Sequence, residues 1–335
     1  MSDDSPALKP VLTLKGLLVW AGILACVTVV VALGCSLPGA HRLTWNIWTM
    51  RLFRLAAAAT VGAALAAAGM ALQAILRNPL AEPYVLGVSS GAGIGVLAGT
   101  AILPLAALGW LTIPALAMIG ALATCAVVYA IAQRRGRLDP FVLILSGVII
   151  NVFNGAVMMG LLLLADRNKI LEFIRWSMGD LPQWIWAEPL LLVFCAVLVA
   201  AGWVMLVFRG SAYNALGLGD DVAQSTGVAV DRLRVETFIV AALMTAAAVC
   251  LAGPIGFVGL IVPHVCRMIL GADHRRLAVV SGFAGAIFLM AADTLCRTVG
   301  PMLGVGKIPV GIITALSGGP FFIVLLRRRA GESQL

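Results

Sequence analysis

Charged residues are scarce in this sequence. Asp, Glu, Lys and Arg make up 11% of the 335 residues, hydrophobic residues make up 61%, and the mean hydropathy is +1.05. A soluble domain carries about 25% charged residues and about 45–50% apolar residues. A chain with so little charge cannot present a polar surface to water on all sides. The composition therefore excludes a soluble enzyme and indicates a protein surrounded by lipid.

Patterns for catalysis or metal binding are also missing. The three histidines are far apart in the chain, and the seven cysteines show no CxxC spacing, so neither a metal site nor a disulfide framework is predicted. There is no Walker A motif, because Gly306 and Lys307 are followed by Ile308, where the motif requires Ser or Thr. We therefore predict no catalytic residues, no metal and no cofactor on this chain.

Long apolar segments dominate the sequence instead. Crossing the hydrocarbon core of a bilayer takes about 17–25 mostly apolar residues in a helix. The segments that meet this need are Val11–Leu33, Leu55–Leu76, Tyr84–Leu103, Thr112–Ala132, Phe141–Leu164, Pro189–Phe208, Val235–Ala252, Ile255–Leu270, Leu277–Val299 and Ile308–Leu326. They lack the alternation of barrel strands. We predict an all-α integral membrane protein with ten transmembrane helices, the first of them retained, in a single domain over residues 1–335.

The basic residues predict the orientation of these helices. With the N-terminus in the cytoplasm, 15 of the 23 basic residues fall on the cytoplasmic side. The positive-inside rule therefore favours short cytoplasmic termini, at residues 1–10 and 327–335. The net charge of +8 is mostly this signal, and no soluble domain exists to carry a nucleic-acid-binding face.

Some basic residues lie on the outside, where this rule disfavours them. Arg51 and Arg54 are three residues apart at the outer start of the second span, and Arg297 lies near the outer end of the ninth. They are either side chains snorkelling to the interface or a docking surface for an acidic partner. Asp293, the one acid clearly within a span, is four residues before Arg297, so we predict a structural Asp293–Arg297 pair rather than a proton relay.

Two further patterns concern packing and the outer surface. The second span is largely Ala and Gly, and Gly91, Gly95 and Gly99 repeat every four residues, which favours close helix contacts. The longest outer connection, Ala165–Glu188, has apolar residues at helical spacing, which predicts a short helix on the outer membrane surface.

Three longer motifs resemble one protein family. They are Arg77-Asn78-Pro79-Leu80-Ala81-Glu82-Pro83 followed by Leu86-Gly87-Val88-Ser89-Ser90-Gly91-Ala92, then Gly253-Pro254-Ile255-Gly256-Phe257-Val258-Gly259-Leu260-Ile261-Val262-Pro263-His264, and finally Pro309-Val310-Gly311 with Gly318-Gly319-Pro320-Phe321-Phe322. In order and spacing they are similar to the bacterial ABC importer permeases for iron–siderophore, haem and vitamin B12, over essentially the whole chain.

The resemblance implies a permease subunit of the larger, ten-span type of ABC importer in the bacterial inner membrane. Its expected partners are a second copy of the chain, two separate ATPase subunits that hold ATP and Mg, and a periplasmic substrate-binding protein. The missing Walker A motif is then expected. Siderophore, cobalamin and haem permeases share the motifs quoted above. We rank an iron chelate first, cobalamin second and haem third.

The resemblance also implies two sites. The segment at about 210–232 resembles the coupling loop, two short helices that sit in a cleft of the ATPase; its candidate residues are Leu216, Gly217, Asp220, Asp221, Ala223, Gln224 and Gly227. Arg51, Arg54 and Arg297 match positions that meet carboxylates of the binding protein. Family members typically have Pro where this chain has Phe53, so the local helix start is expected to differ.

Two questions stay open at this point. Asn151 and Asn154 in the fifth span face either the transport pathway or a neighbouring helix. An ion-coupled secondary transporter is the alternative function. The scarcity of carboxylates within the spans and the coupling-like loop argue against it.

Overall fold

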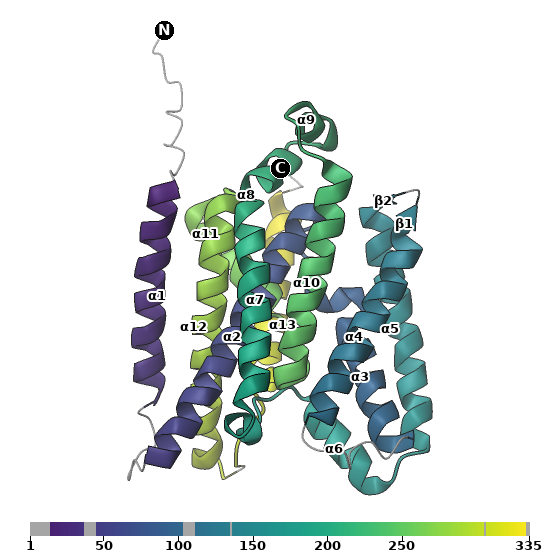
Figure 1. Ribbon diagram of the computed structural model, residues 1–335, viewed down its shortest axis with the longest axis vertical. Helices are drawn as coiled ribbons and strands as arrows, with labels where there is room; N and C mark the ends of the chain where they lie inside the picture. The colour runs from purple at the N-terminus through teal and green to yellow at the C-terminus, as the bar shows by residue number, and fades with distance from the viewer. Residues whose placement is uncertain (1–13, 37–44, 103–110, 135, 305, 333–335) are drawn as a thin grey trace.

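The protein is a bundle of helices that run nearly parallel or antiparallel to one another (Figure 1). The computed structural model describes residues 14–36, 45–102, 111–134, 136–304 and 306–332. Residues 1–13 and 333–335, at the two predicted cytoplasmic termini, and Arg42 in an outer loop lie outside the described residues. The one sheet among the described residues consists of two antiparallel strands of two residues each, which agrees with the predicted all-α class.

The elements follow one another in this order: α1 (Leu14–Ser36), α2 (Trp45–Ile75), η1 (Pro83–Leu86), α3 (Val88–Leu97), η2 (Ala98–Ile102), α4 (Thr112–Ala132), β1 (Gln133–Arg134), β2 (Arg137–Leu138), α5 (Pro140–Leu163), α6 (Arg167–Ser177), η4 (Gln183–Trp186), α7 (Pro189–Phe208), α8 (Gly210–Gly217), α9 (Asp220–Ser225), α10 (Val230–Ala252), α11 (Val258–Leu270), α12 (His274–Met302) and α13 (Val310–Glu332).

Each of the ten predicted segments coincides with a helix. Seven are long and apolar enough to cross a membrane, namely α1, α2, α4, α5, α7, α10 and α12, and the other three have shorter apolar helical stretches, Val88–Thr100 at α3, Val258–Leu270 at α11 and Val310–Ile323 within α13. Several helices extend past the predicted apolar stretch. α2 begins at Trp45 rather than Leu55, and it runs without interruption through Phe53.

The two ends of the bundle are distinct (Figure 1). α1 begins and α13 ends at the end that carries α8 and α9, whereas α6 lies at the opposite end. We call these the α8–α9 end and the α6 end. The predicted short helix of the longest outer connection is α6, and Phe173 and Trp176 on it stack with ring centroids 5.8 Å apart.

Small residues let α2 run through the centre of the bundle. A Cβ atom added to Gly62 would lie 2.1 Å from the backbone oxygen of Gly285 on α12. One added to Gly69 would lie 1.9 Å from the oxygen of Gly259 on α11. The backbones therefore touch directly, which only glycine permits. The prediction that the second span is buried among helices agrees with the burial of most of its residues, including every residue from Val61 to Ile75.

A second set of glycines joins α3 to α4. A Cβ atom on Gly95 would lie 2.1 Å from the oxygen of Leu116, and one on Gly91 would lie 2.4 Å from the oxygen of Gly120. The four-residue glycine spacing therefore marks a contact face, as expected.

The helical path breaks between α10 and α11. We expected a helix from Ile255, but the chain is irregular until Val258, and Phe257 has a positive φ of 69°. The backbone N–H of Phe257 donates to the Glu82 carboxylate, and that of Ile255 donates to the Tyr84 hydroxyl at 2.9 Å. These side chains take the place of the missing intrahelical bonds, so the break is stable inside the bundle.

Candidate functional site

A buried ion pair between Arg54 and Asp293 lies at the α6 end of the bundle. Nε of Arg54 on α2 lies 3.0 and 2.9 Å from the two carboxylate oxygens of Asp293 on α12, and its Nη2 lies 2.5 Å from the first of them. The Asp293 side chain has no exposed surface, and that of Arg54 is 7% exposed. A fork-like contact of this kind is the strongest geometry for an arginine and a carboxylate. It fastens the outer part of α2 to α12.

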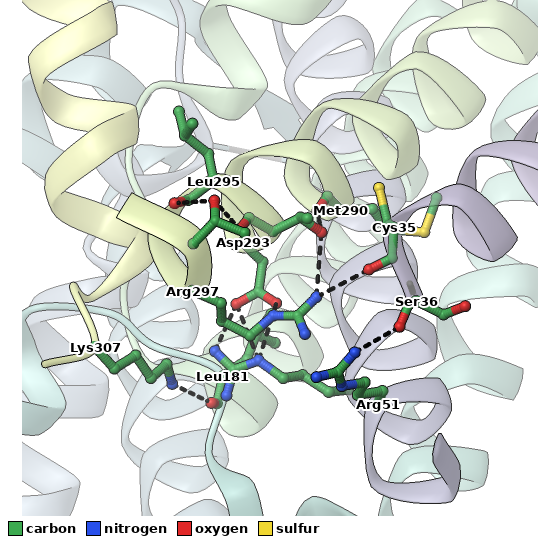
Figure 2. Close-up of polar contacts among 12 residues, drawn as sticks. Cys35, Ser36, Arg51, Leu181, Met290, Asp293, Leu295, Arg297 and Lys307 are labelled. Carbon is green, nitrogen blue, oxygen red and sulfur yellow. Dashed lines mark hydrogen bonds and ion pairs between the residues drawn. The ribbon is translucent and has the colours of Figure 1, made fainter. Parts of the chain in front are cut away.

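Arg297 shares the same carboxylate. Its Nε donates to Asp293 at 3.1 Å, and its Nη2 donates to the backbone oxygen of Cys35 at the end of α1 at 3.3 Å. Figure 2 shows Arg297 between Asp293 and Cys35, with Arg51 donating to the neighbouring Ser36 oxygen at 2.7 Å. The structure therefore contains the Asp293–Arg297 pair, within a larger group of charges that also fixes α1.

Two residues that the sequence interpretation did not single out complete this group. Asp180 follows α6 and accepts from Arg54 at 3.3 Å, and Lys307 precedes α13 and pairs with Asp180. Lys307 also donates to the backbone oxygen of Leu181 at 2.9 Å (Figure 2). Burial lowers the pKa of Lys307, as does Arg54 nearby, while Asp180 acts in the opposite direction.

We call Arg54, Asp180, Asp293, Arg297 and Lys307 the outer charge cluster. It holds three cations and two anions, so it keeps an excess of positive charge that is poorly exposed to water. Its members come from α2, α12 and the segments next to α6 and α13. Asp180 could have been noticed as a lone acid after Gly179, but nothing in the sequence places it near residues 54 or 307.

The predicted docking arginines therefore differ in their surroundings. Arg54 and Arg297 already bind Asp293, and their side chains are 7% and 17% exposed. Arg51 is half-buried and donates to the backbone oxygen of Ser36 at 2.7 Å. Docking of a binding protein stays a prediction for all three arginines.

At the α8–α9 end, the predicted coupling residues form two short helices, as the family resemblance implies. Leu216 on α8 and Ala223 on α9 are fully buried and anchor the pair. Gly219, between the helices, has a φ of 133°, and Gly227 after α9 has a φ of 85°, conformations that L side chains rarely adopt. The two glycines therefore fix the turn between the helices and the exit from α9.

Asp220 ties this pair to two long helices. It pairs with Arg77, just after α2, and with Arg234 on α10, whose Nη1 lies 2.9 Å from Asp220 Oδ2. Arg77 also donates to the backbone oxygen of Leu216 at 3.0 Å. The role of Asp220 in the structure is thus internal, and it holds α8 and α9 against the bundle.

The other side of the pair faces away from the bundle. Asp221, Gln224, Gly217 and Gly227 are exposed. Leu218 and Val222, which the sequence interpretation did not name, are 75% and 42% exposed. Exposed apolar side chains on a compact, anchored element are typical of a protein contact surface.

Asn151 and Asn154 bond to neighbouring helices. Asn151 accepts from Ser90 at 2.7 Å and donates to the backbone oxygens of Tyr84 and Val85 at 3.2 Å. Asn154 is 5% exposed and donates to Ser90 at 3.0 Å and to Thr124 at 3.3 Å. Of the two alternatives, these contacts favour the neighbouring helix, since they use the amides to join α5 to α3 and α4.

Within the described part of the chain, no group of three or more His, Cys, Asp or Glu residues could hold a metal ion. The seven cysteines are free, and five of them are buried.

A family model for the FecCD transport family matches residues 11–328. The chain belongs to this family. A relative in Halobacterium salinarum, a cobalamin import system permease protein, is 42% identical over 288 residues, which are 84% of this chain and 73% of the relative. A hemin transport system permease protein of Yersinia pestis is 36% identical over 331 residues, 93% of this chain and 96% of the relative.

A solved structure supports the same membership. It is an inward-facing conformation of a metal-chelate type ABC transporter, with a TM-score of 0.79 and 27% identity, and the match covers 92% of this chain and 99% of that one. In this FecCD-family chain the three motifs that carry the resemblance are in contact, because Glu82 accepts from the backbone N–H of Phe257 and the His264 ring lies edge-on to Phe321 with centroids 5.8 Å apart. The chain is a multi-pass membrane permease of the ABC importer class.

Proposed function

We propose that the chain is the membrane subunit through which an ABC importer moves a metal chelate from the periplasm to the cytoplasm. The observation that carries this function is the α8–α9 pair, a compact element that is anchored by buried residues and exposes an apolar and acidic face. It fits a permease whose ATPase is a separate chain. The relatives named above act on cobalamin and hemin, and a Bacillus subtilis relative, 36% identical, is an Fe(3+)-citrate import system permease.

We further propose the arrangement of its partners. Two copies of the chain form the pathway, two ATPase subunits bind at the α8–α9 end, and a binding protein docks at the α6 end. The α8–α9 end is then cytoplasmic, together with the start of α1 and the end of α13 (Figure 1). The basic residues concentrated there support this orientation.

Uptake of labelled iron–siderophore, cobalamin and haem in a strain deleted for this gene tests the function. We expect the restored gene to return accumulation of one of the three, and only when a functional ATPase subunit is present. Accumulation that survives loss of the ATPase but disappears with an ionophore would instead support an ion-coupled transporter.

Reversing the charge of Asp221 tests the coupling assignment. Asp221 is exposed on α9, beside Val222 and Gln224. We expect Asp221→Arg to release the ATPase from the purified complex, or to leave hydrolysis uncoupled from uptake. The reason is that the new positive charge would face an ATPase surface whose charge is complementary to an acid, and the two would repel each other. The measurements are complex composition and substrate-stimulated hydrolysis. Glu172→Arg, the same change on exposed α6, should leave ATPase assembly normal, and a normal Asp221→Arg complex would refute the assignment.

We choose Arg51 to test docking at the α6 end, because changing Arg54 or Arg297 would also break a bond to Asp293. An exposed ion pair is worth about 0.2–1 kcal/mol and a better shielded one about 1.5–3 kcal/mol. We therefore expect Arg51→Glu to weaken binding of the binding protein by about 3- to 30-fold, with the loss shrinking as salt rises, because salt screens exposed charges over about 10 Å at 0.1 M. Equal affinity of the binding protein for the wild type and for Arg51→Glu at low salt would contradict docking and would indicate that Arg51 snorkels to the membrane interface. ATPase assembly at the other end serves as the control.

A further inference from the structure

α8 is hydrogen-bonded to the start of α12, a helix that is not its neighbour in the sequence. Asn214 on α8 donates from Nδ2 to the Asp273 carboxylate at 2.8 Å, and its Oδ1 accepts from the backbone N–H of His274 at 2.8 Å. The His274 ring nitrogen Nδ1 lies 2.9 Å from the same oxygen. Asp273 itself caps α12 by accepting from the N–H of Arg275 at 3.0 Å. One amide thus binds both the cap and the first residue of α12.

The surrounding contacts make this joint tight. A Cβ atom on Gly210, the first residue of α8, would lie 2.8 Å from the Cα of Arg275. Tyr213 is fully buried, lies edge-on to the His274 ring with centroids 6.2 Å apart, and shares a 2.8 Å hydrogen bond with Thr237 on α10. α8 therefore cannot shift without moving the first turn of α12 or breaking these bonds.

α12 then reaches the other end of the protein. Its 29 residues make a rod of about 44 Å. It touches α2 backbone to backbone where Gly62 meets Gly285, and it carries Asp293 and Arg297 of the outer charge cluster near its far end. A displacement of its first turn is therefore transmitted to α2 and to that cluster.

A second connection from the same segment is weaker. Asp220 pairs with Arg77, and the two side chains are 37% and 41% exposed, so water screens the pair. The Asn214 bridge uses neutral and charge-assisted bonds in a part-buried site beside a buried tyrosine. It is better shielded from water than the Asp220–Arg77 pair, while the Asp220–Arg234 pair holds α9 to α10.

We propose that Asn214 is the positioning residue that passes movement of the α8–α9 pair directly into α12, and through α12 and α2 to the outer charge cluster. This inference rests on the proposed coupling function of α8–α9. It adds a route that runs through a side-chain joint as well as through the chain connections to α7 and α10.

An exchange of the two polar side chains tests the joint. Asn214→Asp places a second carboxylate against that of Asp273, and adding Asp273→Asn restores one donor and one acceptor with the roles reversed. Asn caps a helix about as well as Asp, so the start of α12 is kept. The assay uses the complete importer in liposomes and measures substrate moved per ATP hydrolysed, together with complex composition and thermal unfolding.

We expect Asn214→Asp to lower the transport-to-hydrolysis ratio by about 5-fold or more, because losing a hydrogen bond worth about 1 kcal/mol changes an equilibrium by about that factor. We expect the double exchange to return the ratio to within about 2-fold of wild type. A wild-type ratio in the single variant, or a double exchange that restores thermal unfolding but not the ratio, overturns the inference. If the aspartate variant does not assemble, Asn214→Ala removes both the donor and the acceptor without adding charge and should also lower the ratio; an unchanged ratio overturns the inference equally. Failure of the proposed function would differ, because the wild-type complex itself would then show no ATP-dependent uptake.

Discussion

Asp293→Ala is expected to destabilise the protein by about 3–5 kcal/mol, the cost of leaving a buried charge without its partner. Arg54 would keep only the 3.3 Å contact with Asp180, while Arg297 and Lys307 would repel it. The loss should appear as a much lower midpoint of thermal unfolding in detergent, and as poor recovery of the monodisperse protein.

A double variant separates the charge effect from lost packing. Asp293→Ala combined with Arg54→Leu removes both buried partners, and replacing a buried pair by apolar residues is often close to neutral. We expect it to recover most of the stability. Glu172→Ala, which removes an exposed acid from α6, should change stability by no more than about 0.5 kcal/mol. If Asp293→Ala unfolds at the same temperature as Glu172→Ala, the outer charge cluster does not hold these helices together.

Gly62→Ala is expected to separate α2 from α12. The new methyl carbon would lie 2.1 Å from the Gly285 oxygen and 2.9 Å from the Leu289 Cβ. Overpacking a core commonly costs about 1–3 kcal/mol, and the cost here should lie at the upper end or above, because the atom in the way is backbone and cannot rotate aside. Thermal unfolding and transport activity should both fall.

The matched control is Gly22→Ala on α1, where an added Cβ meets nothing within 4 Å. Alanine is favoured over glycine inside a helix by about 0.5–1 kcal/mol, so this variant should be neutral or slightly more stable. Equal stability of Gly62→Ala and Gly22→Ala would contradict the direct backbone contact.

The apolar runs were sufficient to place each of the ten segments on a helix, because a helix that crosses lipid needs a continuous apolar stretch. Helix ends were less predictable. Trp45–Arg54 contains polar and charged residues, so most of it lay outside the predicted apolar stretch, yet it is helical, and Arg54 pairs with Asp293, 239 residues away. The break between α10 and α11 was predicted only at Gly253-Pro254, where glycine and proline interrupt a helix locally. Its extension to Phe257 was missed, because it involves hydrogen bonds from residues 255 and 257 to the distant Tyr84 and Glu82.

The candidate sites show the same contrast between residues that are close in the sequence and residues that are brought together only by folding. The two short helices at residues 210–225 followed from a contiguous motif. The sequence showed that Asp293 and Arg297 are one helical turn apart, but Arg54, Asp180 and Lys307 join them only through the packing of distant segments. Asn214 carries no signal of its own in the sequence, since its partners at 273 and 274 are fixed by the way α8 folds back onto α12.

The break between α10 and α11 has a consequence for how the protein is made. α11 has 13 residues, about 20 Å of helix, which is too short to enter a bilayer of about 30 Å without help. The irregular residues before it bond to Glu82 and Tyr84, which are synthesised 175 and 171 residues before their backbone partners. We therefore expect α11 to enter the membrane only after the first half of the chain is in place. Insertion would then be an ordered process in which an early segment provides the acceptor groups for a late one.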